Sequence, residues 1–251
     1  MKNKDKLLNS ILPVLTVIAI IVLWSVFAST IDNAFILPSV SSVMESFGAL
    51  LTSREFYIAL FSTFLRSLIA FIISFVFGFV LAVLSVKSSA VKSVLSPIIK
   101  IMRALPTIAV VLLLLLWTTS NIAPVVVTML VVLPTVYTQV ISAFNSLEKT
   151  VSEAARVDGA NEKAVFLKVE LPQAMPTVYS AIGSGISLNF KLMVAAEVLS
   201  QTAKSIGYML NTSKVYFETA QMFALVIASV IIGVIIESVF EVISKKSSSF
   251  K

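Results

Sequence analysis

Among the polar side chains within apolar stretches of this sequence, four are best placed to do chemistry: Arg66, Asn189, Lys191 and Glu197. A charge inside a hydrophobic segment is costly, so it usually faces a cavity, a pathway or a partner. Arg66 and Glu197 either snorkel to an interface or pair with each other. Lys191 lies too deep to snorkel, which favours a cavity. The alternative to these local roles is that Arg66, Asn189, Lys191 and Glu197 line a translocation path, where two cations and one anion favour an anionic or polar solute.

Catalytic chemistry is not indicated by the residue types present. The chain has no Cys and no His, which excludes thiol chemistry, disulfides and His-based metal or general-base sites. No clustered intramembrane carboxylates replace them, so we predict no catalytic residues, no metal site and no enzyme. The chain also lacks a Gly-x-x-x-x-Gly-Lys phosphate loop. Any ATP chemistry must therefore belong to another subunit.

The composition is that of a polytopic membrane protein. Of 251 residues, 58% are hydrophobic and only 13% are charged, about half of what a soluble domain carries. Backbone polar groups must be satisfied within each span, which predicts an all-α helix bundle. Pro106, Pro124 and Pro134 either loosen the spans or mark their ends. The six expected spans are Ile11–Ala28, Ile58–Val86, Val94–Trp117, Pro124–Phe144, Pro176–Leu199 and Ala220–Ile243.

The distribution of Lys and Arg predicts the orientation of these spans. With the N-terminus inside, one side holds fourteen of these cations and the other three, namely Arg54, Lys204 and Lys214. Both termini are therefore expected in the cytoplasm. The first apolar run is long enough to span and has no clear cleavage site, so we expect a retained helix rather than a signal peptide.

Two outer segments are longer than plain turns. After Leu37-Pro38-Ser39, which is typical of a helix start, apolar residues recur with helical spacing. These residues are Val40, Val43, Met44 and Phe47. We expect a short surface helix that, with residues 200–219, forms a docking surface; ordinary capping of the bundle is the alternative.

A charged stretch between spans four and five, residues 147–172, predicts a helix–bend–helix elbow on the cytoplasmic side. Ser152 is expected to cap a helix that starts at Glu153, and Gly159 to end it in the left-handed conformation. A second helix is expected over residues 160–169, stopped by Leu171-Pro172. Its apolar face, made by Val165, Phe166 and Val169, predicts an element that fits a groove on another protein. A solvated structural loop is the alternative.

The elbow resembles the EAA loop of permease subunits of bacterial ATP-binding cassette (ABC) importers. That pattern is Glu-Ala-Ala, three residues, Gly, nine residues, then Ile-x-Leu-Pro. This chain has Glu153, Ala154 and Ala155, then Gly159, then Val169 in place of Ile, then Leu171 and Pro172. The resemblance implies that these residues form the coupling element that contacts a cytoplasmic ATPase.

Further motifs resemble the nitrate/sulfonate/taurine-type branch of that family. They are Leu37-Pro38-Ser39, Ser67-Leu68 beside Arg66, Arg103-Ala104-Leu105-Pro106, Ala195-Ala196-Glu197-Val198-Leu199 and Ile206-Gly207-Tyr208-Met209-Leu210. Two departures leave the solute unassigned: the turn after Trp117, and the absence of an early Arg in span five.

The resemblance implies one transmembrane domain over residues 1–251 with the type I ABC importer permease fold, containing the coupling loop at 147–172. It implies a bacterial inner-membrane location, ATPase subunits that bind ATP and Mg, an extracytoplasmic solute-binding protein and a second permease copy. The alternative is a secondary transporter driven by an ion gradient. It would need acidic residues in mid-membrane, where only Glu197 is a candidate.

Overall fold

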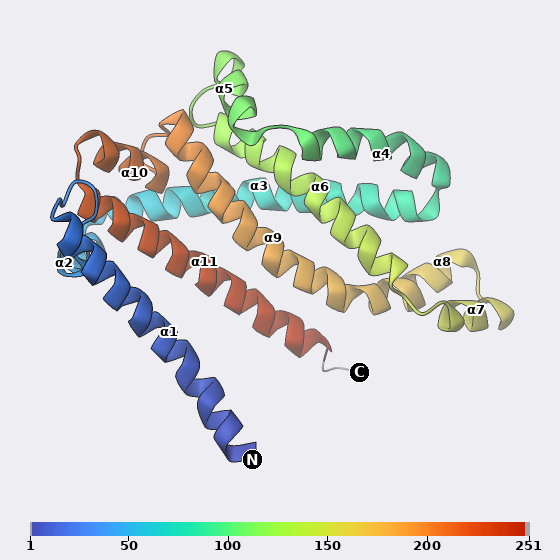
Figure 1. The fold of residues 1–251 in the computed structure, drawn as a ribbon. Helices are drawn as coiled ribbons and strands as arrows, with labels where there is room; N and C mark the ends of the chain where they lie inside the picture. Colours follow the sequence, from blue (N-terminus) through green and yellow to red (C-terminus); the bar gives the residue numbers. More distant parts are fainter. Residues whose placement is uncertain (1, 249–251) are drawn as a thin grey trace. The chain divides into compact units, whose positions relative to one another are not determined.

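The computed structural model describes residues 2–248, with side chains described for 11–148, 150–239 and 242. Within that part of the chain, helices are the only regular elements (Figure 1). In order they are α1 (Lys2–Ile31), α2 (Val40–Thr52), α3 (Arg54–Lys87), α4 (Ser89–Ala104), α5 (Thr107–Trp117), α6 (Ala123–Asn145), α7 (Lys149–Val157), α8 (Glu162–Val165), the π-helix η1 (Phe166–Glu170), α9 (Leu171–Ser200), α10 (Ile206–Val215) and α11 (Thr219–Ser248).

The predicted all-α membrane bundle is confirmed. Five helical stretches among the described residues are long and apolar enough to cross a membrane, and a sixth span is possible if α4 and α5 count as one. The five are Ile11–Ile31, Arg54–Lys87, Ala123–Asn145, Glu162–Ser200 and Thr219–Val239.

The expected third span, Val94–Trp117, is not one continuous helix. The chain bends by 90° between α4 and α5, as Figure 1 shows. Leu105 is extended (φ −64°, ψ 127°), because a residue that precedes a proline avoids the helical region. Pro106 also has no N–H to continue the hydrogen-bond ladder. At 11 residues α5 is about 16 Å long, too short to cross the hydrocarbon alone.

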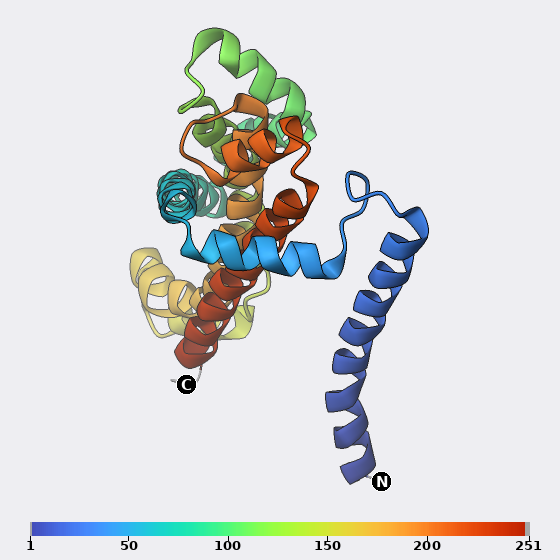
Figure 2. The ribbon, with the colours of Figure 1, turned by 90° about the vertical axis from the view of Figure 1, so that its left-hand side faces the viewer.

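The chain divides into two compact units. Unit 1 comprises Met1–Tyr57 and Met209–Ala228. In it, Trp24 Nε1 donates a hydrogen bond of 3.0 Å to the Pro38 carbonyl, and its ring lies 5.4 Å from that of Phe223. Ser39 caps α2 as predicted, accepting from the Ser42 N–H. Figure 2 shows α2 running across the direction of α1.

On α2, the predicted apolar face holds only in part. Val43 is buried, but Met44 is 57% exposed. Leu50, which the spacing did not single out, is buried with Val43. The helix and its cap are therefore as expected, while its buried stripe is narrower and extends further along the chain.

Unit 2 comprises Ile58–Tyr208 and Ser229–Lys251 and contains the hydrophobic core. α6 and α9 pack side by side along their length (Figure 1). Phe71 of α3 reaches this core, where its ring faces Gly185 of α9. Gly185 thus allows α3 to pack closely against α9.

Candidate functional site

The first helix of the elbow (residues 147–172) begins earlier than predicted. α7 starts at Lys149, after Glu148, and no side chain caps it. The prediction that Ser152 caps a helix starting at Glu153 is therefore wrong. Ser152 is 5% exposed and lines a pocket with Phe144, so it packs inward instead of capping. Glu148 has an extended backbone (φ −72°, ψ 112°), and the helical conformation begins at the next residue.

The turn at Gly159 has the predicted geometry. Gly159 has φ +89°, a conformation that favours glycine. Its N–H donates to the Arg156 carbonyl and the Ala160 N–H to the Ala155 carbonyl, each at 3.0 Å. This pair of bonds is a Schellman motif, which satisfies the last carbonyls of α7. Asn161 then caps α8 by accepting from the Ala164 N–H at 2.8 Å.

The elbow does not stop at Leu171-Pro172, contrary to the prediction. α8 passes through η1 directly into α9, so the elbow and the span form one continuous helical stretch. Pro172 lies at the start of α9. Its ring would clash with the carbonyl of residue 168 in a regular helix. The wider π-turn relieves this, and Leu171 donates instead to the Phe166 carbonyl five residues back.

The apolar face of the second elbow helix packs inside this chain, so the prediction that it fits a groove on another protein is wrong for Val165 and Phe166. They are 0% and 8% exposed. The Phe166 ring stacks on Phe144 of α6 at 5.7 Å, and Lys87 Nζ of α3 lies 3.8 Å from its centroid. Hydrophobic burial decides this, because α6 and α3 offer an apolar face within the same unit. The large hydrophobic residues exposed on the described part of the elbow are Val151, Val157 and Leu167.

Arg156 makes the principal ionic contacts of the elbow. Its Nε donates to Glu162 at 2.8 Å, and its Nη2 donates to Glu162 at 3.1 Å and to Glu170 at 3.2 Å. The hydrogen bond to Glu162 raises the pKa of Arg156 above its usual value. Arg156 and Glu170 also line a pocket of about 420 Å³, together with Ser152, Glu153 and residues of α3 and α6.

The predicted coupling residues lie along this elbow. Glu153 and Ala154 are exposed on α7, Ala155 is half-buried, and Gly159 is exposed in the turn. Leu171 is half-buried and Pro172 exposed at the start of α9. Arg156, Glu162 and Glu170 were not singled out from the sequence. The available signal was a basic and an acidic residue on either side of a glycine turn.

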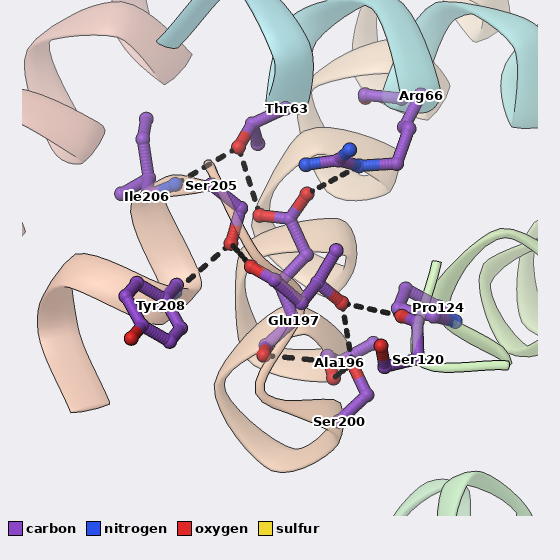
Figure 3. Close-up of polar contacts among 12 residues, drawn as sticks. Thr63, Arg66, Ser120, Pro124, Ala196, Glu197, Ser200, Ser205, Ile206 and Tyr208 are labelled. Carbon is purple, nitrogen blue, oxygen red and sulfur yellow. Dashed lines mark hydrogen bonds and ion pairs between the residues drawn. The ribbon is translucent and has the colours of Figure 1, made fainter. Parts of the chain in front are cut away.

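A buried polar network lies near the other end of α9, drawn in Figure 3. Glu197 is fully buried and accepts a bond of 2.9 Å from Arg66 Nε and one of 2.8 Å from the Thr63 hydroxyl. Thr63 in turn accepts from the Ile206 N–H at 3.0 Å. A β-carbon at Gly207 would collide with Glu197. The two motifs around Glu197 and Gly207, separate in sequence, are thus in direct contact.

The other two polar residues of the apolar stretches lie in different surroundings. Asn189 is buried and donates to Ser67, at 2.7 Å to its carbonyl and 2.6 Å to its hydroxyl. Lys191 is exposed, and its Cε lies 3.6 Å from where a β-carbon of Gly233 would be. The structure therefore joins Arg66 to Glu197, and leaves Asn189 and Lys191 outside that network. Thr63 was missed and Ser67 was noted only as part of a motif, because isolated hydroxyls in apolar helices carry no signal of their partners.

Lys191 belongs to one exposed stripe on α9 that is mixed in character. The stripe consists of Thr177, Ser180, Ser184, Leu188, Lys191, Ala195 and Leu199. The exposed surface of α1, by comparison, is mainly Ile, Leu and Val, as suits contact with lipid. Small and polar side chains around a charge instead suit a helix–helix contact or an aqueous path.

The fold of this chain is similar to the folds of solved ABC transporters. The MetNI methionine ABC transporter in inward-facing form matches 75% of this chain and 94% of its own, with a TM-score of 0.67 and 18% identity. A bacterial ABC transporter involved in import of the acidic polysaccharide alginate matches 97% of this chain and 96% of its own, with a TM-score of 0.66 and 16% identity. At these identities the likeness establishes the fold.

Residues 74–249 match the model of the binding-protein-dependent transport system inner membrane component family, and the chain belongs to that family. Similar proteins include the putative aliphatic sulfonates transport permease protein SsuC of Bacillus subtilis, 23% identical over 90% of this chain and 83% of its own. The taurine transport system permease protein TauC of Escherichia coli is 23% identical over 85% of this chain and 80% of its own. The chain is thus a multi-pass membrane permease subunit of an ABC importer, as predicted, and neither an enzyme nor an ion-gradient-driven transporter.

Proposed function

We propose that this permease conducts a small polar or anionic solute across the bacterial cytoplasmic membrane and is driven by an ATPase that grips residues 147–172. In this proposal two copies form the pore, and a binding protein delivers the solute from outside. ATP and Mg bind to the ATPase, not to this chain. ATP-driven closure of the ATPase pulls the two elbows together and opens the path outward.

The two-sided character of the elbow carries the coupling proposal. On its inner side Val165 is buried, and Phe166 packs against Phe144 of α6 and Lys87 of α3. Its outer side exposes Val157 by 87% and Val151 by 44%, with Glu153 and Ala154 on the same short helix. An exposed apolar residue flanked by charge is typical of a surface that binds another protein. We therefore assign ATPase contact to the α7 side rather than to the second elbow helix.

The exposed stripe of α9 supports a translocation path. Lys191 is its charged member, and no hydrogen bond or ion pair joins it to another described residue. Arg66 is 19% exposed and partly neutralised by Glu197. We propose that Lys191, with the exposed part of Arg66, contacts the solute. In this proposal the buried Asn189 and Glu197 do not touch the solute but position Ser67 and Arg66, to which they are hydrogen-bonded. Because the free charge is positive, aliphatic sulfonates are the first solute class to test.

The outer surface of unit 1 supports a docking surface for the binding protein. Phe35 and Phe217 contact edge to face, with their ring centroids 6.4 Å apart, and the Thr219 hydroxyl donates to the Phe35 carbonyl at 3.0 Å. Phe35, Tyr216 and Phe217 are each about 70% exposed. Exposed aromatic residues gathered on one surface are typical of protein interfaces.

The first experiment is purification of the tagged chain from its native membrane, followed by identification of co-purifying proteins. We expect an ATPase at one copy per permease. Val157→Asp should abolish its recovery, because a charge replaces the exposed apolar contact. Val215→Asp, at a valine 61% exposed outside the elbow, is the matched control and should retain the ATPase. A parent chain that purifies without any ATPase would contradict the coupling proposal.

A further inference from the structure

The turn between the two elbow helices is the mechanically weak point of the coupling element. Residues 158–161 connect α7 to α8, and Gly159 lies in open space, with no atom within 4 Å of where its β-carbon would be. The hydrogen bonds made by residues of the turn itself, at Gly159, Ala160 and Asn161, are local. A force applied to α7 could therefore bend the chain at Gly159 instead of moving α9.

Arg156 crosses that turn and contacts both ends of the segment beyond it. Glu162 is the first residue of α8, and Glu170 is the last residue of η1. The Arg156 Nη2 donates to both carboxylates, while Nε makes the second, parallel bond to Glu162. The planar guanidinium fork suits such paired contacts, whereas a lysine presents a point charge and cannot reproduce them.

Apolar packing also holds the same segment. Phe166 stacks on Phe144, and Val165 is fully buried. Helical structure then runs without interruption from Glu162 to Ser200. The segment beyond the turn is therefore already joined to span α9, and α7 is the part of the elbow that needs a separate connection.

We infer that Arg156 is a positioning residue that makes the elbow a rigid lever, by clamping α7 across the Gly159 turn to Glu162 and Glu170 at both ends of the α8–η1 segment. This inference rests on the proposed function, in which the ATPase moves α7. Displacement of α7 then shifts the start of α9. Lys191 lies further along the same helix and moves with it. Without the clamp, the same displacement is absorbed at Gly159.

A single exposed ion pair usually contributes little to stability. The clamp differs in geometry, since one side chain serves two acceptors, and Glu170 is only 22% exposed. Its expected role is thus to keep an angle between helices, and loss of Arg156 should leave the fold and membrane insertion unchanged.

The absence of Cys from the chain allows a direct test by paired spin labels. Thr150→Cys on α7 and Ser184→Cys on α9 are both exposed positions. Pulsed electron paramagnetic resonance would measure the distance distribution between the two labels. The sample is the full chain in lipid nanodiscs, with and without the co-purified ATPase. Arg156→Met should broaden the distribution at least twofold, and Arg156→Lys should broaden it less.

Two further variants separate the clamp from a general effect of charge. Glu162→Gln combined with Glu170→Gln should broaden the distribution as Arg156→Met does, because both acceptors are weakened. Lys163→Met removes a cation from the same elbow without touching the clamp and should leave the distribution narrow. A narrow distribution in Arg156→Met would overturn the inference.

The same samples separate this inference from the coupling proposal. With the ATPase bound to the parent chain, the nucleotide state should shift the position of α9 relative to α6, measured with labels at Ser184→Cys and Asn145→Cys. Arg156→Met should keep the ATPase but lose at least half of that shift. A parent chain that binds no ATPase defeats the coupling proposal, whereas the width of the Thr150–Ser184 distribution still tests the clamp.

Discussion

The Nε of Arg66 donates a hydrogen bond of 2.9 Å to a carboxylate oxygen of Glu197 that is entirely shielded from solvent. The pair joins α3 to α9, and through Thr63 it reaches the N–H of Ile206 at the start of α10. One carboxylate thus connects three helices. Because Arg66 Nη2 has no hydrogen-bond partner among the described residues, the arginine depends on this single acceptor.

Replacing Glu197 by Gln should destabilise the protein strongly. The substitution leaves Arg66 charged and partly buried without a counter-charge, and breaking a buried pair in this way costs about 3 kcal/mol or more. Thr63→Val removes one hydrogen bond and should cost about 1 kcal/mol. Thermal unfolding in detergent measures both.

The double variant Arg66→Met with Glu197→Gln is the control for this pair. It removes both charges together and should recover part of the stability lost in Glu197→Gln alone. Equal stability of the parent chain and Glu197→Gln would show that the network does not hold the three helices.

Replacing Gly207 by Ala should also destabilise, for a steric reason. The new β-carbon would collide with the side chain and backbone of Glu197 and with the N–H of Val198. Because the backbone must shift to make room, we expect this overpacking to lower the free energy of unfolding by about 1–3 kcal/mol. The melting temperature of the purified chain measures the loss.

Gly48→Ala is the matched control for that substitution. Gly48 lies inside α2 with nothing within 4 Å of its β-carbon position. Ala favours a helix over Gly by about 1 kcal/mol, so this variant should be neutral or slightly more stable. A loss in Gly48→Ala equal to that in Gly207→Ala would argue against the steric explanation.

Replacing Gly159 by Val should uncouple transport while leaving membrane insertion intact. At φ +89° a β-branched residue is strained, so the Schellman turn that orients α7 should be lost. Uptake should fall at least tenfold in vesicles that contain normal amounts of protein. Gly159→Asn, which tolerates positive φ better, should retain more uptake. Unchanged uptake in Gly159→Val would show that the turn geometry is not required.

Replacing Lys191 by Ala should reduce uptake of an alkylsulfonate without loss of the ATPase. The reason is that Lys191 supplies the unpaired positive charge on the exposed stripe of α9. Lys191→Arg should retain most uptake, whereas Lys191→Glu should abolish it for an anion. Kinetics in Lys191→Ala that equal those of the parent chain would assign this lysine to packing beside Gly233 instead.

Local features of the elbow and of the outer helix were predictable because short-range physics determines them. A glycine that follows a short amphipathic helix was expected at positive φ, and Gly159 is found there. Ser39 caps α2 because its side chain needs only the N–H three residues ahead. Neither feature depends on a distant part of the chain.

Most features that depend on distant neighbours were mispredicted or missed, although the pairing of Arg66 with Glu197 was one of the alternatives. Phe166 was assigned to an outside partner, but Phe144 and Lys87 cover it. The stop expected at Pro172 became a π-turn, since packing of Val165 and Phe166 keeps the chain helical up to the proline. Asn189 lies among apolar residues in sequence, and only the tertiary structure shows that Ser67 accepts the hydrogen bonds of its side-chain amide.

The sequence by itself determined the membrane class, the helical spans other than the third, the presence of the elbow and its glycine turn, because hydropathy and local backbone preference require no tertiary contacts. Tertiary structure alone decided which side of the elbow is exposed, and that Arg66 belongs to Glu197 while Lys191 has no ionic partner among the described residues. The physical reason is that burial and charge pairing are properties of neighbours in space, which residues far apart in sequence provide.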